Sequence, residues 1–145
     1  MNSVEQFLTA QEEKTVVQAI QKAEKNTSGE IRVHIEETPN KPSIERAKEV
    51  FLQLNMDKTA QRNAVLFYIA TETKQFAIVG DEEIDKKVTD NFWQEETKYI
   101  TSLFKQNKNC KALEDGISMV GEKLKLYFPY QSGDKDELSN EISKG

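Results

Sequence analysis

The chain has 145 residues, of which 37% are hydrophobic and 31% are charged, and its formal net charge is −5. This length suits one soluble domain with a single core, and no stretch approaches the roughly 20 apolar residues of a membrane helix. The acidic balance favours cations over nucleic acid as partners, and the single cysteine, Cys110, excludes an intramolecular disulfide and a cysteine-based zinc site.

A first helix is predicted close to the N-terminus. Residues 1–14 lack the basic segment and the long apolar segment of a secretory signal, so a cytoplasmic protein is expected. Thr9 and Glu12 have the spacing of a capping box, and apolar residues follow them at helical intervals. The helix should end before Gly29.

The next two segments predict the strands of a sheet. Residues 30–36 alternate between apolar and polar side chains, which is typical of a strand whose two faces differ in polarity. Residues 64–70 form a nearly continuous apolar run. With the TETK turn and a second run to residue 79, they predict a β-hairpin whose first strand is buried on both faces. An amphipathic helix is expected between the two segments, marked by Ala47, Val50, Phe51 and Leu54.

Helical patterns continue in the C-terminal half of the chain. An aromatic-rich helix face, interpreted as core, contains Phe92, Trp93, Tyr99 and Phe104. The final helix carries Gly116 and Gly121, which indicate close approach to another backbone because glycine costs about 1 kcal/mol relative to alanine in a helix. Residues 131–145 are predicted to be a polar, flexible tail, in which Leu138 and Ile142 can still dock against the body.

These elements predict an α/β fold, a three-layer α/β/α sandwich in which helices flank a small mixed sheet on both faces. Because a helix separates residues 30–36 from residues 64–70, the two strands should be parallel and joined by a right-handed crossover. The hairpin makes the third strand antiparallel to them. The starts of the first two strands and the end of the third then meet at one rim of the sheet, and Glu36, Glu37 and the TETK turn lie at the opposite rim.

The first of these rims is the predicted site. Its charged residues are Glu30, Arg62, Asp81 and Glu82. Carboxylate oxygens that converge at a rim suit a hard cation such as calcium or magnesium, which can also act as an electrophile towards phosphate. Gly80 permits close approach of a ligand, whereas Asp81 is also placed to cap the next helix.

Several segments, in their order and spacing, resemble the TPM domain family, which is named for thylakoid-lumen, photosystem II repair and receptor-modulating members. They read SGEIRVHIE, RNAVLFYIATETKQFAIVGDEEID, FW and KLKLYFPYQS. The resemblance covers residues 5–130 and indicates a single TPM-like domain over residues 1–130, in the soluble single-domain form. It implies an α/β/α sandwich, a divalent cation, and the phosphatase or nucleotide-hydrolysing activity associated with some members. Residue by residue, it marks Ser28, Gly29, Glu30, Gly80, Asp81 and Asp90.

Two features depart from the family pattern. Arg62 stands where many members have an acidic residue, which removes one negative ligand and adds a guanidinium that can pair with carboxylate or phosphate. The GDEEID segment replaces the glycine-aromatic-glycine turn of many members, which disfavours cradling of a phosphate by backbone amides.

The predicted metal ligands are Glu30, Asp81, Glu82 and Asp90, and Arg62 is the predicted contact for a phosphate-containing small molecule. Each has a structural alternative: Asp81 and Asp90 as helix caps, and Arg62 as the partner of Asp81 or Glu30. His34, the only histidine, is interpreted as a sheet-face residue that touches a helix. Two functions remain open. One is a monomeric protein that binds calcium or magnesium without turnover, and the other is a metal-dependent phosphatase or nucleotide phosphate hydrolase that uses the same rim.

Overall fold

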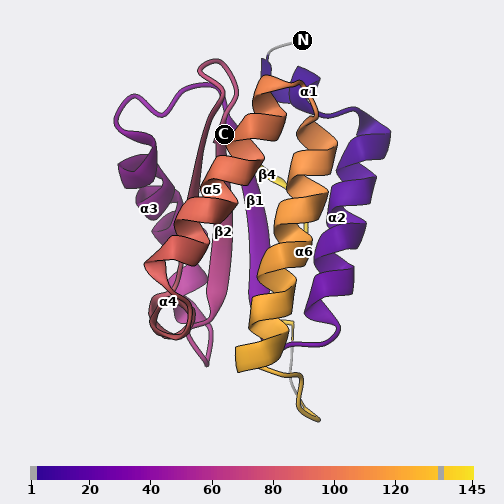
Figure 1. The fold of residues 1–145 in the computed structure, drawn as a ribbon, viewed down its shortest axis with the longest axis vertical. Helices are drawn as coiled ribbons and strands as arrows, with labels where there is room; N and C mark the ends of the chain where they lie inside the picture. The colour runs from indigo at the N-terminus through magenta and orange to yellow at the C-terminus, as the bar shows by residue number, and fades with distance from the viewer. Residues whose placement is uncertain (1–2, 134–135) are drawn as a thin grey trace.

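A four-stranded sheet lies at the centre of the computed structural model, which describes residues 3–133 and 136–145 (Figure 1). Its strands are β1 (Glu30–Glu36), β2 (Ala64–Ala70), β3 (Gln75–Gly80) and β4 (Ser143–Lys144), in the spatial order β3-β2-β1-β4. β1 and β2 are parallel, with Glu30 opposite Ala64 and Glu36 opposite Ala70, and β3 is antiparallel to β2. The predicted parallel pair and the predicted hairpin are therefore both confirmed.

Helices cover both faces of the sheet. The long helices α2 (Ala10–Glu24), α5 (Asp90–Lys105) and α6 (Asn109–Tyr127) lie on one face, and α3 (Ser43–Gln53) lies on the other with the 3-10 helix η1 (Met56–Lys58). The short helices are α1 (Ser3–Phe7) and α4 (Glu82–Lys87). None of the described helices is long and apolar enough to cross a bilayer. The arrangement is the three-layer α/β/α sandwich that the sequence predicts.

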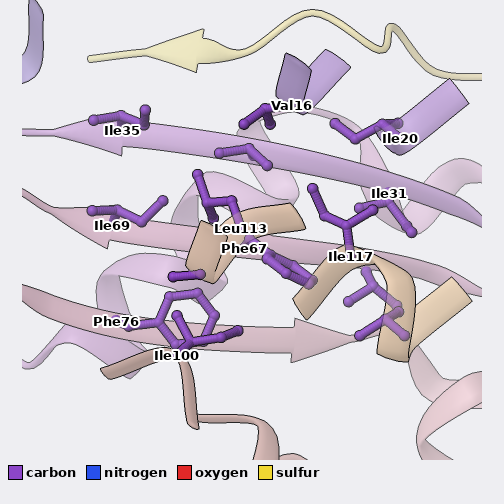
Figure 2. Packing of buried hydrophobic residues seen from close by; sticks show 14 of the residues in the cluster. Val16, Ile20, Ile31, Ile35, Phe67, Ile69, Phe76, Ile100, Leu113 and Ile117 are labelled. Atoms are coloured by element: carbon purple, nitrogen blue, oxygen red, sulfur yellow. The ribbon is translucent and has the colours of Figure 1, made fainter. Parts of the chain in front are cut away.

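Strand β2 contributes to the cores on both faces of the sheet, as its apolar run predicts. All 7 of its residues are buried. Because side chains alternate along a strand, the odd-numbered residues of β1 and β2 pack with α2, α5 and α6. Figure 2 shows Phe67 and Ile69 of this cluster among Ile20, Ile100 and Leu113. The even-numbered residues of β2 pack with α3 and η1 on the other face.

The described C-terminal residues 136–145 run along β1. β4 pairs in parallel with β1, with Ser143 opposite His34. The backbone N–H of Gly145 donates to the carbonyl oxygen of Ile35 at 3.0 Å. The end of the chain thereby extends the sheet beyond β1.

Both apolar residues of this C-terminal segment dock as the sequence analysis allowed. Leu138 packs against the cluster on the α3 side, and Ile142 packs against the cluster on the other face. The flexibility of residues 131–145 stays a prediction. Residues 134–135 of that segment, like residues 1–2 of the domain, lie outside the described residues.

Local hydrogen bonds set the helix boundaries. Thr9 Oγ1 accepts the backbone N–H of Glu12 at 3.1 Å, and Glu12 Oε1 accepts that of Thr9 at 2.9 Å, so the predicted capping box begins α2. Asp81 caps α4, and Thr89 caps α5. Asp90 is therefore the first residue of α5 rather than its N-cap.

The close approach to another backbone that two glycines of α6 predict is confirmed at Gly121, whereas the atoms nearest to Gly116 belong to side chains. A Cβ atom on Gly121 would lie 2.9 Å from the Cβ of Ala23 in α2. One on Gly116 would lie 2.5 Å from the Cδ1 of Ile100 in α5. Glycine at position 121 lets α6 lie close to the backbone of α2, and glycine at position 116 leaves space for the side chain of Ile100.

The prediction that Tyr99 belongs to the core is wrong. The residue is 38% exposed, and its hydroxyl donates to Asp115 Oδ2 at 2.6 Å. It lies beside the buried stripe of α5, which is formed by Glu96, Ile100, Leu103 and Phe104. The aromatic spacing of this helix therefore marks one flank of its buried face as well as its centre.

Candidate functional site

The starts of β1 and β2 and the end of β3 meet at one rim of the sheet, as predicted. The backbone N–H of Asp81 donates to Ala64 O at 2.9 Å, and Asn63 Nδ2 donates to Ser28 Oγ at 3.2 Å. These bonds hold residues of three strands together. The acidic side chains of the rim nevertheless fall into separate groups.

The first group is an ion-pair cluster of Arg62, Asp81 and Glu82, which we call the Arg62 cluster. Arg62 Nε and Nη2 donate to the two carboxylate oxygens of Asp81 at 2.6 and 2.9 Å, and Arg62 Nη1 lies 3.3 Å from Glu82 Oε1. Asp81 Oδ1 also accepts the backbone N–H of Glu82 at 2.8 Å, which caps α4. Both oxygens of the buried Asp81 are thus occupied, and the bond to Asp81 raises the pKa of Arg62.

The second group lies in a cavity of about 260 Å³, which we call the Glu30 pocket. It contains the carboxyls of Glu24 at the end of α2, Glu30 at the start of β1 and Asp136 in the C-terminal segment. Lys25 also lines the pocket, but within the described part of the chain its ammonium forms no ion pair. The pocket is therefore predominantly acidic.

Glu30 is almost fully buried, and only one of its two carboxyl oxygens accepts an N–H. The residue is 2% exposed, and Oε1 accepts the backbone N–H of Leu138. Oε2 is buried and accepts no N–H among the described residues, and its polar surroundings include the carboxyl of Asp136, which is close enough to Glu30 to share a proton with it. A buried polar atom without a partner costs on the order of 1–3 kcal/mol. A group that bonds to this oxygen would remove that free-energy cost.

Both glutamates of the pocket are hard to ionise. Burial raises the pKa of Glu30 to about 8, a change that the N–H of Leu138 opposes and the carboxyl of Asp136 reinforces. Burial likewise raises the pKa of Glu24 to about 8. The N–H of Ile31, which Glu24 Oε2 accepts at 2.9 Å, opposes this change, and the charge of Asp136 reinforces it. Glu24 and Glu30 are therefore mainly protonated at pH 7 when no cation is bound.

Asp90 stands apart from both groups. It is exposed at the start of α5, and no hydrogen bond or ion pair among the described residues joins it to Glu30, Asp81 or Glu82. Over residues 3–133 and 136–145, no set of three or more His, Cys, Asp or Glu residues is arranged to hold a metal ion. The structure thus places the predicted ligands in three different locations and joins only Asp81 and Glu82, through Arg62.

Two carboxyls of the Glu30 pocket, those of Glu24 and Asp136, are not among the residues predicted from the sequence. Glu24 had a detectable signal, because a helix that ends shortly before a strand brings its last turn beside the start of that strand. Asp136 had none, since it belongs to a segment without periodicity whose position depends on the docking of Leu138.

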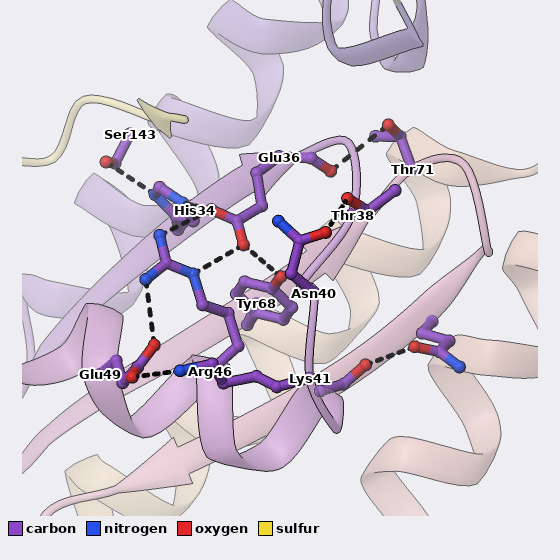
Figure 3. Close-up of polar contacts among 12 residues, drawn as sticks. His34, Glu36, Thr38, Asn40, Lys41, Arg46, Glu49, Tyr68, Thr71 and Ser143 are labelled. Carbon is purple, nitrogen blue, oxygen red and sulfur yellow. Dashed lines mark hydrogen bonds and ion pairs between the residues drawn. The ribbon is translucent and has the colours of Figure 1, made fainter.

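At the opposite rim, Glu36 is the centre of a densely bonded network (Figure 3). Its carboxylate accepts Arg46 Nε at 2.9 Å and Nη2 at 3.1 Å, accepts the hydroxyl of Tyr68, and bonds to His34 Nε2 at 3.0 Å. Burial acts to raise the pKa of Glu36, but these donors, led by Arg46, lower it to about 2. His34 Nδ1 in turn bonds to Ser143 Oγ at 2.9 Å, so the hydrogen-bond partners of His34 lie on β1 and β4. Because both oxygens of Glu36 are occupied, we assign this network a structural role.

Comparison with known proteins finds matches over most of the chain. A sequence model of the TPM domain matches residues 1–123. The chain is also similar to the BA42 protein from the psychrophilic bacterium Bizionia argentinensis, whose NMR structure it matches with 50% sequence identity, 96% coverage of each chain and a TM-score of 0.89. Among curated proteins, the comparison finds no match.

Two more distant NMR structures share the fold. One is the N-terminal domain of a protein from P. gingivalis, with 12% identity, coverage of 81% of this chain and 76% of that chain, and a TM-score of 0.66. The other is the N-terminal domain of the cg2496 protein from Corynebacterium glutamicum, with 16% identity, coverage of 81% and 74%, and a TM-score of 0.62. At these identities the similarity concerns the fold alone.

Proposed function

The chain belongs to the TPM domain family, and from this premise we propose that it binds a divalent cation, calcium or magnesium, in the Glu30 pocket. The observation that carries the proposal is the crowding of three carboxyls, those of Glu24, Glu30 and Asp136, around a buried Glu30 Oε2 that accepts no N–H among the described residues. Calcium and magnesium are hard cations that take oxygen ligands, roughly 6 to 8 of them in the case of calcium. A cation in the pocket would bind Oε2 of Glu30 and replace the protons of Glu24 and Glu30 as the positive charge among these carboxyls.

Three segments of the chain would supply the carboxylate ligands, which a cation would have to draw closer together than they lie in the described structure, with water completing the coordination shell. Glu30 contributes from β1, Glu24 from the end of α2, and Asp136 from the C-terminal segment. Since the pKa of Glu24 and that of Glu30 are both raised to about 8, a cation must displace protons to bind. The affinity should therefore increase as the pH rises towards 8.

The other predicted ligands rank below Glu30. A cation at Asp81 would have to displace the Arg62 guanidinium, which is bonded to both carboxylate oxygens. Glu82 and Asp90 are exposed, where water already solvates a carboxylate well and a cation adds little. Ligation by these three residues stays a prediction that the same experiment addresses.

Titration of the full chain with calcium and with magnesium, followed by amide NMR and calorimetry, tests the proposal. We expect saturable chemical-shift changes at Glu24, Glu30 and Leu138, and release of protons at pH 7. Glu30→Gln preserves the size of the side chain and removes its charge. Because Glu30 is the central ligand, this variant should weaken binding by at least about tenfold.

Glu82→Gln is the matched control, because it removes the same charge from an exposed carboxylate of the same rim. Unchanged affinity in this variant, together with weakened binding in Glu30→Gln, supports the Glu30 pocket. Shift changes confined to residues 80–85 and lost in Asp81→Asn would instead assign the cation to the Arg62 cluster. If neither cation binds saturably, the proposal is wrong.

The alternative function, a metal-dependent phosphatase or nucleotide phosphate hydrolase, would use Arg62 to contact phosphate. A phosphate would have to compete there with Asp81 and Glu82, which already accept the guanidinium N–H groups. The same samples can be assayed for phosphate release from ATP and from p-nitrophenyl phosphate. Cation-dependent release that is abolished by Arg62→Gln would establish catalysis, whereas saturable binding without release would leave a cation-binding protein.

A further inference from the structure

β3 is the edge strand of the described sheet on the side away from the C-terminus, with β2 as its neighbour. The N–H of Asp81 donates to the carbonyl of Ala64, which fixes the alternation of this antiparallel pair. By that alternation, the β3 residues that bond to β2 are Gln75, Ala77 and Val79. Those whose N–H and C=O groups point outward are Phe76, Ile78 and Gly80. An added strand would meet hydrogen-bonding positions at these three residues.

A groove of about 740 Å³ runs alongside this edge. It is lined by residues 76–78 of β3, by one face of α5 and by the start of α3. α5 runs antiparallel to β3, because a Cβ on Gly80 would lie 2.6 Å from Trp93, while the rings of Phe76 and Phe104 lie 6.0 Å apart. The groove therefore has a strand edge along one side and a helix along the other.

The groove carries free positive charge in a chain that is acidic as a whole. Its α5 side contributes Lys98 and Lys105, both exposed and, within the described residues, without an ion pair, and one acidic residue, Glu95. Lys74, in the turn between β2 and β3, lies near the same end of α5 as Lys105, because its Nζ donates to Asn107 Oδ1 at 3.3 Å. The end of the groove next to this turn is thus the most basic.

We propose that this groove binds an extended, acidic peptide segment of a partner protein as an additional strand beside β3. Addition of a strand to an open sheet edge is an established mode of peptide recognition, in which backbone bonds give affinity and neighbouring side chains give specificity. Thr97 and Thr101 of α5 also line the groove and offer hydroxyl groups to the peptide. Lys98 and Lys105 are about 10 Å apart along the helix axis, a distance that roughly 3 residues of extended chain span. The acidic residues of the peptide should have a similar spacing.

A second copy of the chain fits this edge less well than a peptide does. In a twofold-symmetric dimer the same residues of the two copies face each other. If two β3 strands paired around Ile78, the middle of α5 in one copy would lie close to the middle of α5 in the other. Lys98 lies in that middle region and would meet its own counterpart, which is a repulsive contact. Lysines beside an edge strand are a common device against pairing of identical edges. The same lysines attract an acidic strand.

Selection from a phage-displayed library of random dodecapeptides on the immobilised full chain tests the proposal. We expect the selected sequences to be enriched in Asp and Glu. A synthetic peptide of the selected sequence, titrated into labelled protein, should shift the amides of Phe76, Ile78 and Gly80 and protect them from hydrogen exchange. Its affinity should fall as salt is added, because exposed charge pairs are screened.

Lys98→Glu combined with Lys105→Glu should weaken binding of this peptide by at least about tenfold. The matched control is Lys22→Glu with Lys125→Glu, which makes the same charge change on exposed residues of α2 and α6 and should leave the affinity unchanged. Equal affinity of the groove variant and the control, or selection of no peptide that shifts those three amides, would overturn the proposal. Concentration-dependent shifts of the same amides without peptide would overturn it too, by assigning the edge to a second copy.

Discussion

Glu96 is a carboxyl group placed inside the apolar core. It lies on the buried stripe of α5 and is 0% exposed, and a Cβ on Gly116 of α6 would lie 3.1 Å from its Oε1. Neither carboxyl oxygen has a hydrogen-bond partner among the described residues. Burial raises the pKa of Glu96 to about 8. The folded chain therefore keeps this group protonated at neutral pH, whereas the unfolded chain ionises it.

This single residue should make the protein less stable as the pH rises. The folded pKa of about 8 lies above the usual glutamate pKa of 4.5, so the stabilising contribution of the proton is complete below pH 4.5 and is lost as the pH approaches 8. Glu96→Met, which is apolar and of similar length, should raise the free energy of unfolding by roughly 1–3 kcal/mol. The gain should be larger at pH 8 than at pH 5. Urea unfolding of both proteins at the two pH values measures it.

Glu95→Gln is the control for this measurement, because Glu95 is the exposed neighbour on the same helix. Its unfolding curve should follow that of the wild type at both pH values. Glu24 and Glu30 also have pKa values raised to about 8, so the wild-type pH dependence should decrease in Glu96→Met without disappearing. An identical pH dependence in wild type and Glu96→Met would show that Glu96 does not hold a proton in the folded chain.

Among the site residues, those with a local signal were predictable and those without one were not. Asp81 follows a strand and precedes a helix, and its capping of α4 rests on that local order. The pairing of Arg62 with Asp81 was one of two partners that the topology allowed. The burial of Glu30 beside Asp136 depends on a contact between residues more than a hundred positions apart, to which no periodicity in either segment points.

At the scale of elements, length and periodicity decide what the sequence predicts. The hairpin, the alternating strand and the capping box have strong local patterns, and each is present in the structure. α1 has 5 residues and β4 has 2, too few for a pattern to develop, so their formation depends on contacts with the rest of the molecule. Small residues at helix crossings are predictable in part. The glycines of α6 indicate a close contact, but they do not indicate which residue makes it.

The contact between α2 and α6 should tolerate only one methyl group at its closest point. A Cβ on Gly121 would lie 2.9 Å from the Cβ of Ala23, and neither position can move without shifting a helix. Gly121→Ala should therefore lower the free energy of unfolding by roughly 1–3 kcal/mol, although alanine favours the helix by about 1 kcal/mol. In an Ala23→Gly background the same substitution should become neutral or stabilising. Thermal and urea unfolding of the four proteins give the coupling energy.

Ser118→Ala is the control for helix propensity, because Ser118 lies on the exposed side of α6. It should be neutral or slightly stabilising in both backgrounds. If Gly121→Ala costs the same free energy with and without Ala23, the two helices are not in the close contact described.

At the scale of the whole molecule, the two outer strands of the sheet have different surroundings. Beyond β1, the C-terminal segment adds β4 and places Asp136 in the Glu30 pocket. Beside β3 there is a groove lined by two lysines, Lys98 and Lys105, that form no ion pair with the residues the structure describes. One edge of the sheet is thus extended by the C-terminal segment, which also contributes to the proposed cation site. The other edge offers hydrogen-bonding positions to another chain. The proposed cation and the proposed peptide therefore bind at opposite edges of the sheet.

Binding of calcium in the Glu30 pocket should therefore fasten the C-terminal segment to the body of the protein. If Asp136 is a ligand, release of the C-terminal segment removes that ligand from the site. Calcium must then stabilise the state in which the segment is docked, by a free energy that grows with the calcium concentration. This free energy is about 2.7 kcal/mol at 100 times the dissociation constant. The amide of Gly145, which donates to Ile35 O, should then exchange with solvent more than about tenfold more slowly in saturating calcium. The amide of Thr71, bonded to Glu36 O at the opposite rim, should not change. Calcium binding that depends on Glu30 but leaves the exchange of Gly145 unaltered would remove Asp136 from the site, and with it the link between the cation and the edge of the sheet.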